Sequence, residues 1–414
     1  MQRRYFLLSL LGFGLRDTFA LDIKSLYWPD GHKFFNACKG KLPDNLANHE
    51  VVLSALHDID TTQVWDGHVH LVGLGDTDSG IWVNPNSLNL LDIKQYTQFR
   101  FYLNASCPTS DMSVDEGFID HLRNLQWGRG IKFVLLAFDH SYDEHGKRLL
   151  AKTAFYTPNS YAAKIHQQFP DNFEWFASIH PYRKDCVEAV ENAFIKGARG
   201  VKWLPPAMGM DPSSPLCDRF YQAMAHWGLP LLCHCGDEKA VFGTNTQAYA
   251  NPLNLRRALE HGVKVVVAHC GSLGKNIDTD KGKHGPLVSN FDLFTRLMDE
   301  KLYEGLLYGD ISAITQTDRI FSLKTLIPRT DWHPRLLYAS DYPLPGIIPL
   351  ISLRQLQNQD FITEQQADIL KQIRHYNPLL FDFVLKRHLR VAKQSFSKAV
   401  FHTRSLWTGT RILN

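Results

Sequence analysis

Short runs of apolar and β-branched residues alternate along the chain with longer segments in which apolar residues recur at helical spacing. Each short run is typical of a buried strand, and several of the helical segments end at a glycine, a common signal for the end of a helix. The runs predict eight strands, at residues 63–71, 131–139, 173–180, 199–204, 229–235, 263–269, 305–312 and 335–341.

The regular alternation of strands and helices predicts a parallel sheet that helices cover. Eight such units are the number that closes a (β/α)8 TIM barrel. The alternative is an open doubly wound sheet, but the first predicted strand is not followed by a glycine-rich phosphate-binding fingerprint. We therefore predict an α/β fold of the (β/α)8 TIM-barrel class.

The barrel is expected at residues 63–382, after an N-terminal segment at residues 21–62. Residues 73–117 form a long insertion after the first strand. In a barrel, such an insertion lies over the mouth formed by the C-terminal ends of the strands, where active sites form.

The last segment, residues 383–414, carries seven lysine and arginine residues and no acidic residue. Its apolar residues follow helical spacing, at Leu385, Leu389, Ala392, Phe396 and Val400. We predict a basic helical tail that packs on the barrel and exposes its charged face to solvent. A weak association of this tail with an anionic membrane surface is the alternative.

The first residues resemble a bacterial twin-arginine export signal. Arg3 and Arg4 precede an apolar run that ends at Leu15, and residues 18–20 offer a cleavage site. The run is too short to span a bilayer as a helix. We predict that residues 1–20 are an export signal and that the mature protein is periplasmic. The alternatives are an uncleaved anchor, or an ordinary N-terminal helix in a cytoplasmic protein.

The composition is that of a soluble globular protein, with 44% hydrophobic and 21% charged residues. The net charge of +3 is too small to indicate nucleic-acid binding. Among seven cysteines, Cys233, Cys235 and Cys270 lie in predicted strands and are expected to be buried thiols. Cys38 and Cys107 lie outside these runs and are candidates for a disulfide.

The first predicted strand contains two histidines separated by one residue. Side chains at positions i and i+2 share one face of a strand, so His68 and His70 point the same way and Val69 points the opposite way. Two imidazoles on one face suit a metal ion. The alternative is a pair of core or solvated histidines.

Other polar residues stand near the C-terminal ends of later predicted strands: Lys202, His234, His269 and Asp341. The C-terminal strand ends of a barrel converge on one mouth, so these side chains would meet His68 and His70 in one cavity. Histidine and carboxylate are ligand types suited to zinc and similar divalent ions. The sequence therefore predicts a metal site, with zinc the first choice and manganese or iron the alternatives.

With these motifs the chain resembles the amidohydrolase superfamily. Within it, the chain is most similar to the amidohydrolase-related branch that includes decarboxylases of the aminocarboxymuconate-semialdehyde type. The resemblance covers residues 63–382 and is carried by DGHVH at 66–70, GVKWLPP at 200–206, LPLLCHCG at 229–236, VVVAHCGS at 265–272, ASDYP at 339–343 and HYNPLLF at 375–381. The combination is specific, although no single motif is.

The resemblance implies a role for each residue of the predicted metal site. His68, His70 and Asp341 would hold a metal, and the strand-five histidine, His234, would be a further ligand. His269 would be either a ligand of a second metal or a catalytic group. The number of bound metal ions, one or two, therefore remains open.

Lys202 has two possible roles under this resemblance. A lysine ammonium has no acceptor lone pair and cannot ligate a metal, but a carboxylated lysine can bridge two metals. Otherwise Lys202 would be a cation that binds the substrate. His180 and Asp139 also fall at strand ends and are predicted substrate contacts, whereas Asp310 is expected to be structural or to support a ligand.

The predicted activity follows from the chemistry of a bound divalent ion, which lowers the pKa of a water and polarises a carbonyl. Asp341 could then take the proton of the water and deliver it to the leaving group. We predict a metal-dependent hydrolase that acts on an amide, lactone or related bond of a small molecule.

Two alternatives to this hydrolase remain open: a metal-dependent non-oxidative decarboxylase and a catalytically silent metal-binding protein. Lys202 favours the hydrolase, because the resemblance implies a strand-four lysine in hydrolytic two-metal members. The sequence indicates neither the substrate nor the oligomeric state.

We predict that export depends on the twin arginine. The variant with Arg3→Lys and Arg4→Lys should remain in the cytoplasm, because the twin-arginine route requires the pair. Fractionation of cells that express the native chain, this variant and the control Arg16→Lys measures the distribution. An identical cytoplasmic location for the native chain and the double variant would contradict the prediction.

Overall fold

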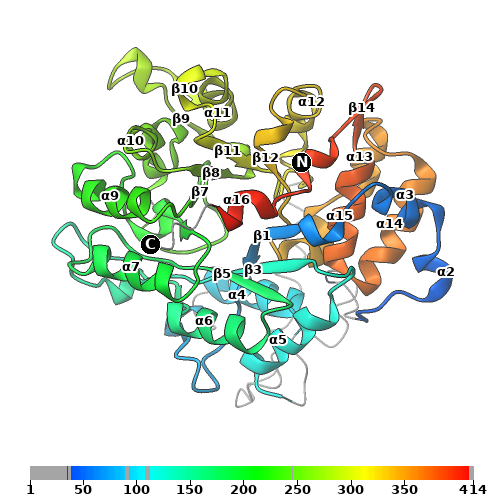
Figure 1. The fold of residues 1–414 in the computed structure, drawn as a ribbon, viewed down its shortest axis with the longest axis horizontal. Coiled ribbons are helices and arrows are strands. Elements are labelled where there is room, and N and C mark those ends of the chain that lie inside the picture. The colour runs from blue at the N-terminus through cyan, green and yellow to red at the C-terminus, as the bar shows by residue number, and fades with distance from the viewer. Residues whose placement is uncertain (1–34, 36–38, 89–92, 108–111, 245, 410–414) are drawn as a thin grey trace. The chain divides into compact units, whose positions relative to one another are not determined.

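The computed structural model describes residues 35, 39–88, 93–107, 112–244 and 246–409 (Figure 1). The chain divides into two compact units, Met1–Gly31 and His32–Asn414, and the described residues belong to the second. The predicted export signal and Cys38 lie outside the described residues. Within the described part of the chain, no helix combines the length and apolar character needed to cross a membrane.

Eight parallel strands form the centre of the fold. They are β1 (Trp65–His70), β3 (Lys132–Leu136), β5 (Phe173–Phe176), β6 (Val201–Trp203), β7 (Leu231–His234), β8 (Val265–Ala268), β11 (Leu307–Asp310) and β12 (Leu336–Leu337). Each lies inside one of the eight predicted ranges. Their short apolar sequences are buried, as expected of strands that are covered on both sides.

Backbone pairing closes these strands into a barrel. One sheet has the order β1-β3-β5 and the other β6-β7-β8-β11-β12. Parallel bridges join Ala177 to Val201 at one junction and Val69 to Tyr342 at the other. Because both junctions are bridged, the predicted (β/α)8 barrel is confirmed and the open doubly wound sheet is wrong.

Helices surround the strands (Figure 1). Those that follow strands of the barrel are α5 (Val114–Asn124), α6 (Asn159–Gln168), α7 (Cys186–Ile195), α8 (Pro205–Met208), α9 (Asp218–His226), α10 (Arg256–Glu260), α11 (Asn290–Asp299), α12 (Leu323–Leu326), α13 (Leu353–Asn358), α14 (Glu364–Tyr376) and α15 (Pro378–His388). Two helices precede the barrel, α2 (Asp44–Ala47) and α3 (Glu50–Leu56), and a hairpin follows β8, formed by β9 (Lys275–Ile277) and β10 (Leu287–Ser289).

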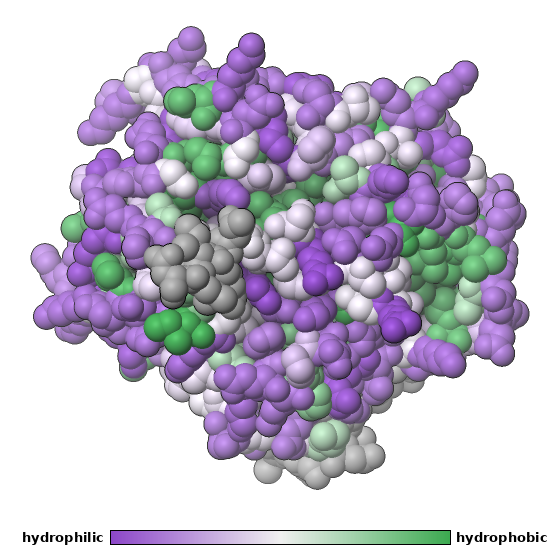
Figure 2. Space-filling view, viewed as in Figure 1, coloured by the Kyte–Doolittle hydropathy of each residue, from purple (hydrophilic) through white to green (hydrophobic). Residues whose placement is uncertain are grey.

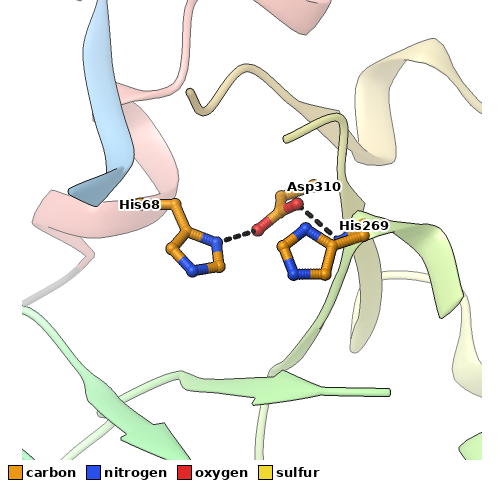
Figure 3. Close-up of side chains that lie close together, drawn as sticks. All are labelled: His68, His269 and Asp310. Atoms are coloured by element: carbon orange, nitrogen blue, oxygen red, sulfur yellow. Dashed lines mark hydrogen bonds and ion pairs between the residues drawn. The ribbon is translucent and has the colours of Figure 1, made fainter. Parts of the chain in front are cut away.

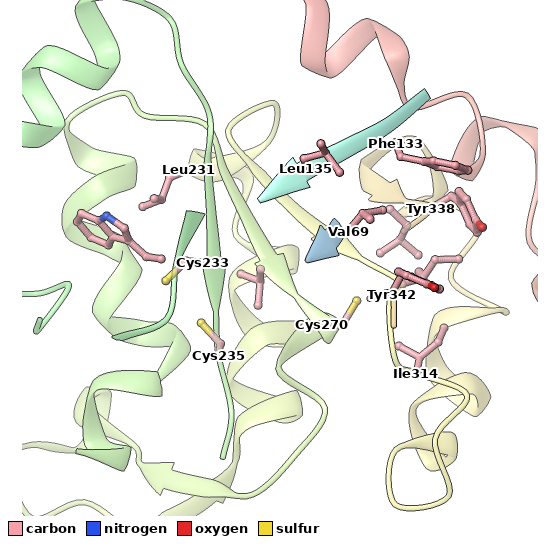
Figure 4. Close-up of a cluster of buried hydrophobic side chains, with 14 of the residues drawn as sticks. Val69, Phe133, Leu135, Leu231, Cys233, Cys235, Cys270, Ile314, Tyr338 and Tyr342 are labelled. Atoms are coloured by element: carbon pink, nitrogen blue, oxygen red, sulfur yellow. The ribbon is translucent and has the colours of Figure 1, made fainter. Parts of the chain in front are cut away.

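The main hydrophobic core lies between the outer faces of the strands and these helices (Figure 4). Val69 is fully buried in this cluster, together with Phe133, Leu135 and Tyr338. Burial of Val69 on the outer face fixes the opposite direction for the side chains before and after it. His68 and His70 therefore point to the inside of the barrel.

The insertion after β1 contributes α4 (Ile93–Ala105) and a strand pair, β2 (Trp82–Val83) with β4 (Phe155–Tyr156). Its end lies beside the barrel mouth, since the Tyr342 hydroxyl, next to Asp341, donates to the Ser106 carbonyl at 3.3 Å. This confirms the predicted position of the insertion. Cys107, one residue further on, is disulfide-bonded, whereas the other described cysteines are free and buried: Cys186, Cys217, Cys233, Cys235 and Cys270.

The C-terminal tail is not the continuous helix that the apolar spacing predicts. After α15 the chain forms a hairpin, β13 (Arg390–Val391) with β14 (Gln394–Ser395), and then α16 (Arg404–Thr408). The Arg390 amide donates to the Phe361 carbonyl, and Ala392 turns the chain with a φ of 53°, which a right-handed helix does not allow. The predicted stripe is buried except for Ala392, but its residues lie on separate elements.

The prediction that the basic side chains of the tail are exposed to solvent is also wrong for Lys386. Its ammonium is fully buried, 2.6 Å from a carboxylate oxygen of Asp382 and 2.7 Å from the Ala339 carbonyl. A buried lysine requires such partners, because transfer of an unpaired charge from water to the interior is costly. Lys386 therefore ties α15 to the last strand of the barrel.

The helix α16 covers the N-terminal end of the barrel and lies at its centre in Figure 1. Trp407 packs in a second buried cluster with inward-facing residues of the strands: Trp65, Val134, Leu136, Phe176, Leu232, Val266, Ala268 and Leu337. A Cβ added to Gly67 would lie 2.8 Å from the Trp407 ring, so glycine is required for this close approach. Hydrophilic side chains cover most of the face around α16 (Figure 2). The predicted membrane contact of the tail remains a prediction.

Candidate metal centre

The C-terminal end of β1 brings two imidazoles to the barrel mouth. The ring centroids of His68 and His70 are 5.3 Å apart. His68 is 1% exposed, whereas the His70 side chain is 25% exposed and so lies nearer to solvent. The alternation of side chains along β1 therefore produces the predicted pair.

Asp341 completes this pair from the loop after β12. Its Oδ1 lies 3.0 Å from His70 Nε2 and 3.3 Å from His68 Nε2. One potential ligand atom from each of His68, His70 and Asp341 lies within 4.8 Å of the other two. Asp341 has a φ of 61°, an uncommon conformation that aspartate tolerates better than most residues.

The charge state of this group suits a cation. Burial raises the pKa of Asp341, but the imidazoles of His68 and His269 outweigh burial and hold that pKa well below its usual range. Burial lowers the pKa of His68, so the neutral imidazole is favoured. Asp341 is thus a carboxylate and His68 offers a lone pair, as metal ligation requires.

Asp310, at the end of β11, orients two histidines of the mouth (Figure 3). Its Oδ2 lies 2.9 Å from His68 Nδ1, and its Oδ1 accepts a hydrogen bond of 2.7 Å from the His269 backbone amide. Ser312 Oγ contacts the same carboxylate and lies 2.7 Å from His269 Nδ1. Both rings therefore turn Nε2 towards Asp341, which lies 3.3 Å from His68 Nε2 and 3.7 Å from His269 Nε2.

A second trio, His68, His269 and Asp310, also has potential ligand atoms within 4.8 Å of one another. Its carboxylate is already engaged by His68, by the His269 amide and by Ser312. This trio is therefore suited to orienting the rings, and His68, His70 and Asp341 are the better candidates to hold a metal. Two imidazoles and one carboxylate are a donor set that fits zinc or manganese.

Lys202, in the middle of β6, also reaches the barrel mouth. The space among these polar side chains is called the chamber below. Its Nζ lies 2.9 Å from His68 Nε2, and the residue is 2% exposed. Burial lowers the pKa of Lys202, although Asp341 and Asp310 act in the opposite direction. The predicted approach of Lys202 to the first-strand histidines is therefore present in the structure.

His234 reaches the chamber but lies outside both trios. Its ring centroid is 5.3 Å from that of His269, and its Nε2 faces the Gly236 carbonyl at 3.2 Å and Glu238 Oε2 at 3.5 Å. Burial lowers the pKa of His234 well below its usual value. The neutral ring is suited to ligation, but Nε2 points to these oxygens.

Two predicted substrate contacts, His180 and Asp139, bond to groups of the protein. His180 is fully buried, with Nε2 3.2 Å from the Met208 carbonyl and Nδ1 accepting from the Tyr182 amide at 3.2 Å. Asp139 Oδ2 accepts hydrogen bonds of 2.9 Å from the His180 amide and from Arg183 Nη1. Both ring nitrogens and this carboxylate have protein partners, and the substrate contact of His180 and Asp139 remains a prediction.

Sequence reasoning missed three polar residues near the predicted ligands. Ser312 stands two residues after Asp310, and Glu238 stands four residues after His234; their positions after strand ends were a usable signal. Arg319 lies in the loop after β11 and donates from Nη1 to Ser272 Oγ at 3.3 Å. No sequence pattern marks Arg319.

The sequence model of a family described as amidohydrolase matches residues 135–379 of this chain. The match contains Lys202, His234, His269, Asp310 and Asp341, and it begins after β1. No curated protein matches the chain.

Several solved structures are similar at low sequence identity. A protein proposed to be a 2-pyrone-4,6-dicarboxylic acid hydrolase, from Pseudomonas putida, is 15% identical, with a TM-score of 0.42 and coverage of 77% of this chain and 97% of that chain. An uncharacterised TIM-barrel protein from Bordetella bronchiseptica is 15% identical, with a TM-score of 0.45 and coverage of 75% and 95%. A 5-carboxyvanillate decarboxylase from Novosphingobium aromaticivorans, complexed with manganese, is 13% identical, with a TM-score of 0.38 and coverage of 74% and 92%. None of these similarities identifies a substrate for this chain.

We predict that Asp310→Asn weakens metal binding by about 10- to 100-fold, the usual effect of removing a partner that orients a ligand. The amide cannot replace the carboxylate that holds His68 Nδ1, the His269 amide and Ser312. Titration of metal-free protein with zinc measures the affinity.

The matched control is Asp139→Asn, which removes another buried carboxylate that accepts backbone hydrogen bonds. It should reduce thermal stability and leave zinc affinity unchanged. Equal zinc affinities for the native protein and Asp310→Asn would show that Asp310 does not support the ligands.

Proposed function

The chain belongs to the amidohydrolase family, and we propose that it is a metal-dependent hydrolase that acts on an amide, lactone or related bond of a small molecule. One observation carries the proposal: His68, His70 and Asp341 place potential metal ligands close together at the barrel mouth, with the Lys202 amine 2.9 Å from His68 Nε2. The C-terminal mouth is where barrel enzymes place their chemistry.

His68, His70 and Asp341 would hold the divalent ion, with zinc proposed and manganese also suited to the donors. Such an ion, when bound, lowers the pKa of a water and polarises the oxygen of the bond to be cleaved. The protein supplies orientation, since Asp310 fixes the ring of His68 through Nδ1. Burial of the donors excludes bulk water, which strengthens every electrostatic interaction in the chamber.

Asp341 and His269 are the residues placed to move protons. The low pKa of Asp341 keeps its carboxylate ionised, so an oxygen is available to accept a proton from the attacking water and to return it to the leaving group. Burial lowers the pKa of His269 to about 3, and Ser312 holds its Nδ1. The neutral His269 ring therefore presents Nε2 towards Asp341 and towards a substrate beside it.

Non-oxidative decarboxylation is the second candidate function. The structure groups three donor residues around one position, while His234 faces Gly236 and Glu238. A single-ion centre of this kind suits the decarboxylating members that the sequence resembles. Lys202 favours hydrolysis instead, because it stands beside the donors in the position of a metal-bridging lysine. We place hydrolysis first on the basis of Lys202.

We also propose that the enzyme is exported to the periplasm. The twin-arginine motif of the sequence motivates this location, and the disulfide of Cys107 supports it. Disulfides persist in oxidising compartments and are rare in the cytoplasm.

The first test is turnover on a panel of lactones, amides and aromatic carboxylic acids, with carbon dioxide release measured separately. We expect hydrolysis by the zinc-loaded or manganese-loaded enzyme, and a loss of at least about 100-fold in kcat for Asp341→Asn, because a general acid/base is removed. Asp382→Asn, a buried carboxylate outside the chamber, is the control for stability.

Carbon dioxide release without hydrolysis would replace the proposal with a decarboxylase. An absence of turnover on the whole panel with a full metal content would support a silent metal-binding protein. Near-normal kcat in Asp341→Asn with normal metal content would remove Asp341 from the mechanism.

The second test concerns Lys202 and the number of metal ions. Burial lowers the pKa of Lys202 and so favours the neutral amine, which can add carbon dioxide to give a carbamate. If this carbamate bridges two ions, protein grown with ample bicarbonate and zinc holds two ions per chain and Lys202→Ala holds one. Metal analysis measures both, with the exposed Lys196→Ala as the control. One ion in both proteins would exclude the bridge and leave Lys202 as a substrate-binding residue.

A further inference from the structure

Arg319 is a buried cation whose hydrogen-bonding capacity the protein does not use. The residue is 6% exposed, and its guanidinium donates one hydrogen bond among the described residues, from Nη1 to Ser272 Oγ. Its Nε is buried without a partner. No carboxylate oxygen of the described residues lies within 4.0 Å of it. A guanidinium has five N–H donors, so most of its capacity remains available.

Arg374 shows how this chain satisfies a buried arginine that has a structural role. Arg374 is 5% exposed, similar to Arg319. Its guanidinium donates four hydrogen bonds of 2.8–3.1 Å, all to backbone carbonyls, of Pro345, Ile347, Ile348 and Ile351. Burial of a charge without such partners is costly. The contrast indicates that the described residues do not supply the main partner of Arg319.

Arg319 borders the chamber of the proposed active site. Ser272, its hydrogen-bond partner, is the third residue after His269, and the Ser272 amide donates to the His269 carbonyl at 3.0 Å. Burial lowers the pKa of His234 and of His269, and the charge of Arg319 lowers both further. The guanidinium is therefore close enough to influence the charge of both imidazoles.

Glu238 and Tyr102 of α4 lie within electrostatic range of Arg319. Burial raises the pKa of Tyr102, the charges of Glu238 and Asp341 raise it further, and that of Arg319 lowers it. Glu238 has its own partners, since Oε1 accepts from the amides of Ala240 and Val241. The Glu238 carboxylate is thus engaged by backbone amides, whereas the remaining donors of Arg319 are available.

We propose that Arg319 binds a carboxylate of the substrate, so that the substrate of the proposed enzyme is an organic acid that carries this carboxylate apart from the bond that reacts. The fork of Nε and an Nη donor matches the two oxygens of a carboxylate. A guanidinium carries one positive charge, which matches the single negative charge of a carboxylate better than a phosphate dianion. This inference rests on the proposed function for the identity of the reaction, but not for the binding itself.

Direct binding tests the proposal independently of turnover. Isothermal titration of metal-free and metal-loaded protein uses benzoate as the carboxylate probe, benzamide as its neutral counterpart and inorganic phosphate as the dianion. We expect benzoate to bind in both metal states, benzamide to bind much more weakly, and phosphate to bind no more tightly than benzoate.

The variants separate charge from hydrogen-bond geometry. Arg319→Gln removes the charge, and Arg319→Lys keeps the charge but not the fork. Both are expected to weaken benzoate binding, by about 10- to 100-fold for Arg319→Gln, the cost of losing charge-assisted hydrogen bonds. Arg374→Lys, the structural counterpart, should lower the melting temperature and leave benzoate binding unchanged. If Arg319→Gln does not fold, Arg319→Lys decides the outcome.

Three results would overturn the proposal: no binding of benzoate to the native protein, equal benzoate affinity in the native and Arg319 variants, or equal affinity for benzamide and benzoate. Tighter binding of phosphate than of benzoate would overturn the assignment to a carboxylate. Loss of benzoate binding in the variants together with no hydrolysis on the panel would uphold Arg319 and reject the hydrolase.

Discussion

The arrangement of the barrel mouth depends on the buried carboxylate of Asp310. It engages the ring of His68, the backbone of His269 and the hydroxyl of Ser312, which belong to three different segments. Burial raises the pKa of Asp310, but these partners outweigh burial and hold it well below its usual range, so the carboxylate stays charged. A charged acceptor at Nδ1 fixes the tautomer and the direction of the His68 ring. As a result, Nε2 of His68 faces Asp341.

Charge in this chamber is balanced only in part by the protein. Lys202, Arg319, Asp310 and Asp341 are all buried there, where electrostatic interactions are strong because water is excluded. The carboxylates have close partners, whereas the guanidinium of Arg319 has one hydrogen bond to a hydroxyl. A site of this kind is stabilised by a bound cation beside Asp341 and by a bound anion beside Arg319. A bound metal and a bound substrate would thus neutralise the buried charges that the protein leaves without close partners.

The two ends of the barrel differ in role: apolar packing stabilises the N-terminal end, and the polar residues of the proposed site lie at the C-terminal end. At the N-terminal end, Trp407 of α16 fills the space between the strands, and Thr403 Oγ1 accepts from the Trp65 amide at 2.9 Å. At the C-terminal end, polar and charged side chains gather: His68, Lys202, His269, Asp310 and Asp341. The tail that follows α15 is therefore part of the barrel core, and its basic charges are placed by that packing rather than by the face of one helix.

The sequence by itself determined the eight strands, the barrel and the approach of His68, His70, Lys202 and Asp341. These follow from local rules, because side chains alternate on a strand and parallel strands end at one mouth. The tertiary structure decided which partner each polar group has. His180 bonds to backbone groups, and the chain after α15 turns into a hairpin. Such outcomes depend on hydrogen bonds between residues far apart in the chain, as with Arg319 and Ser272, and no local pattern of residues encodes them.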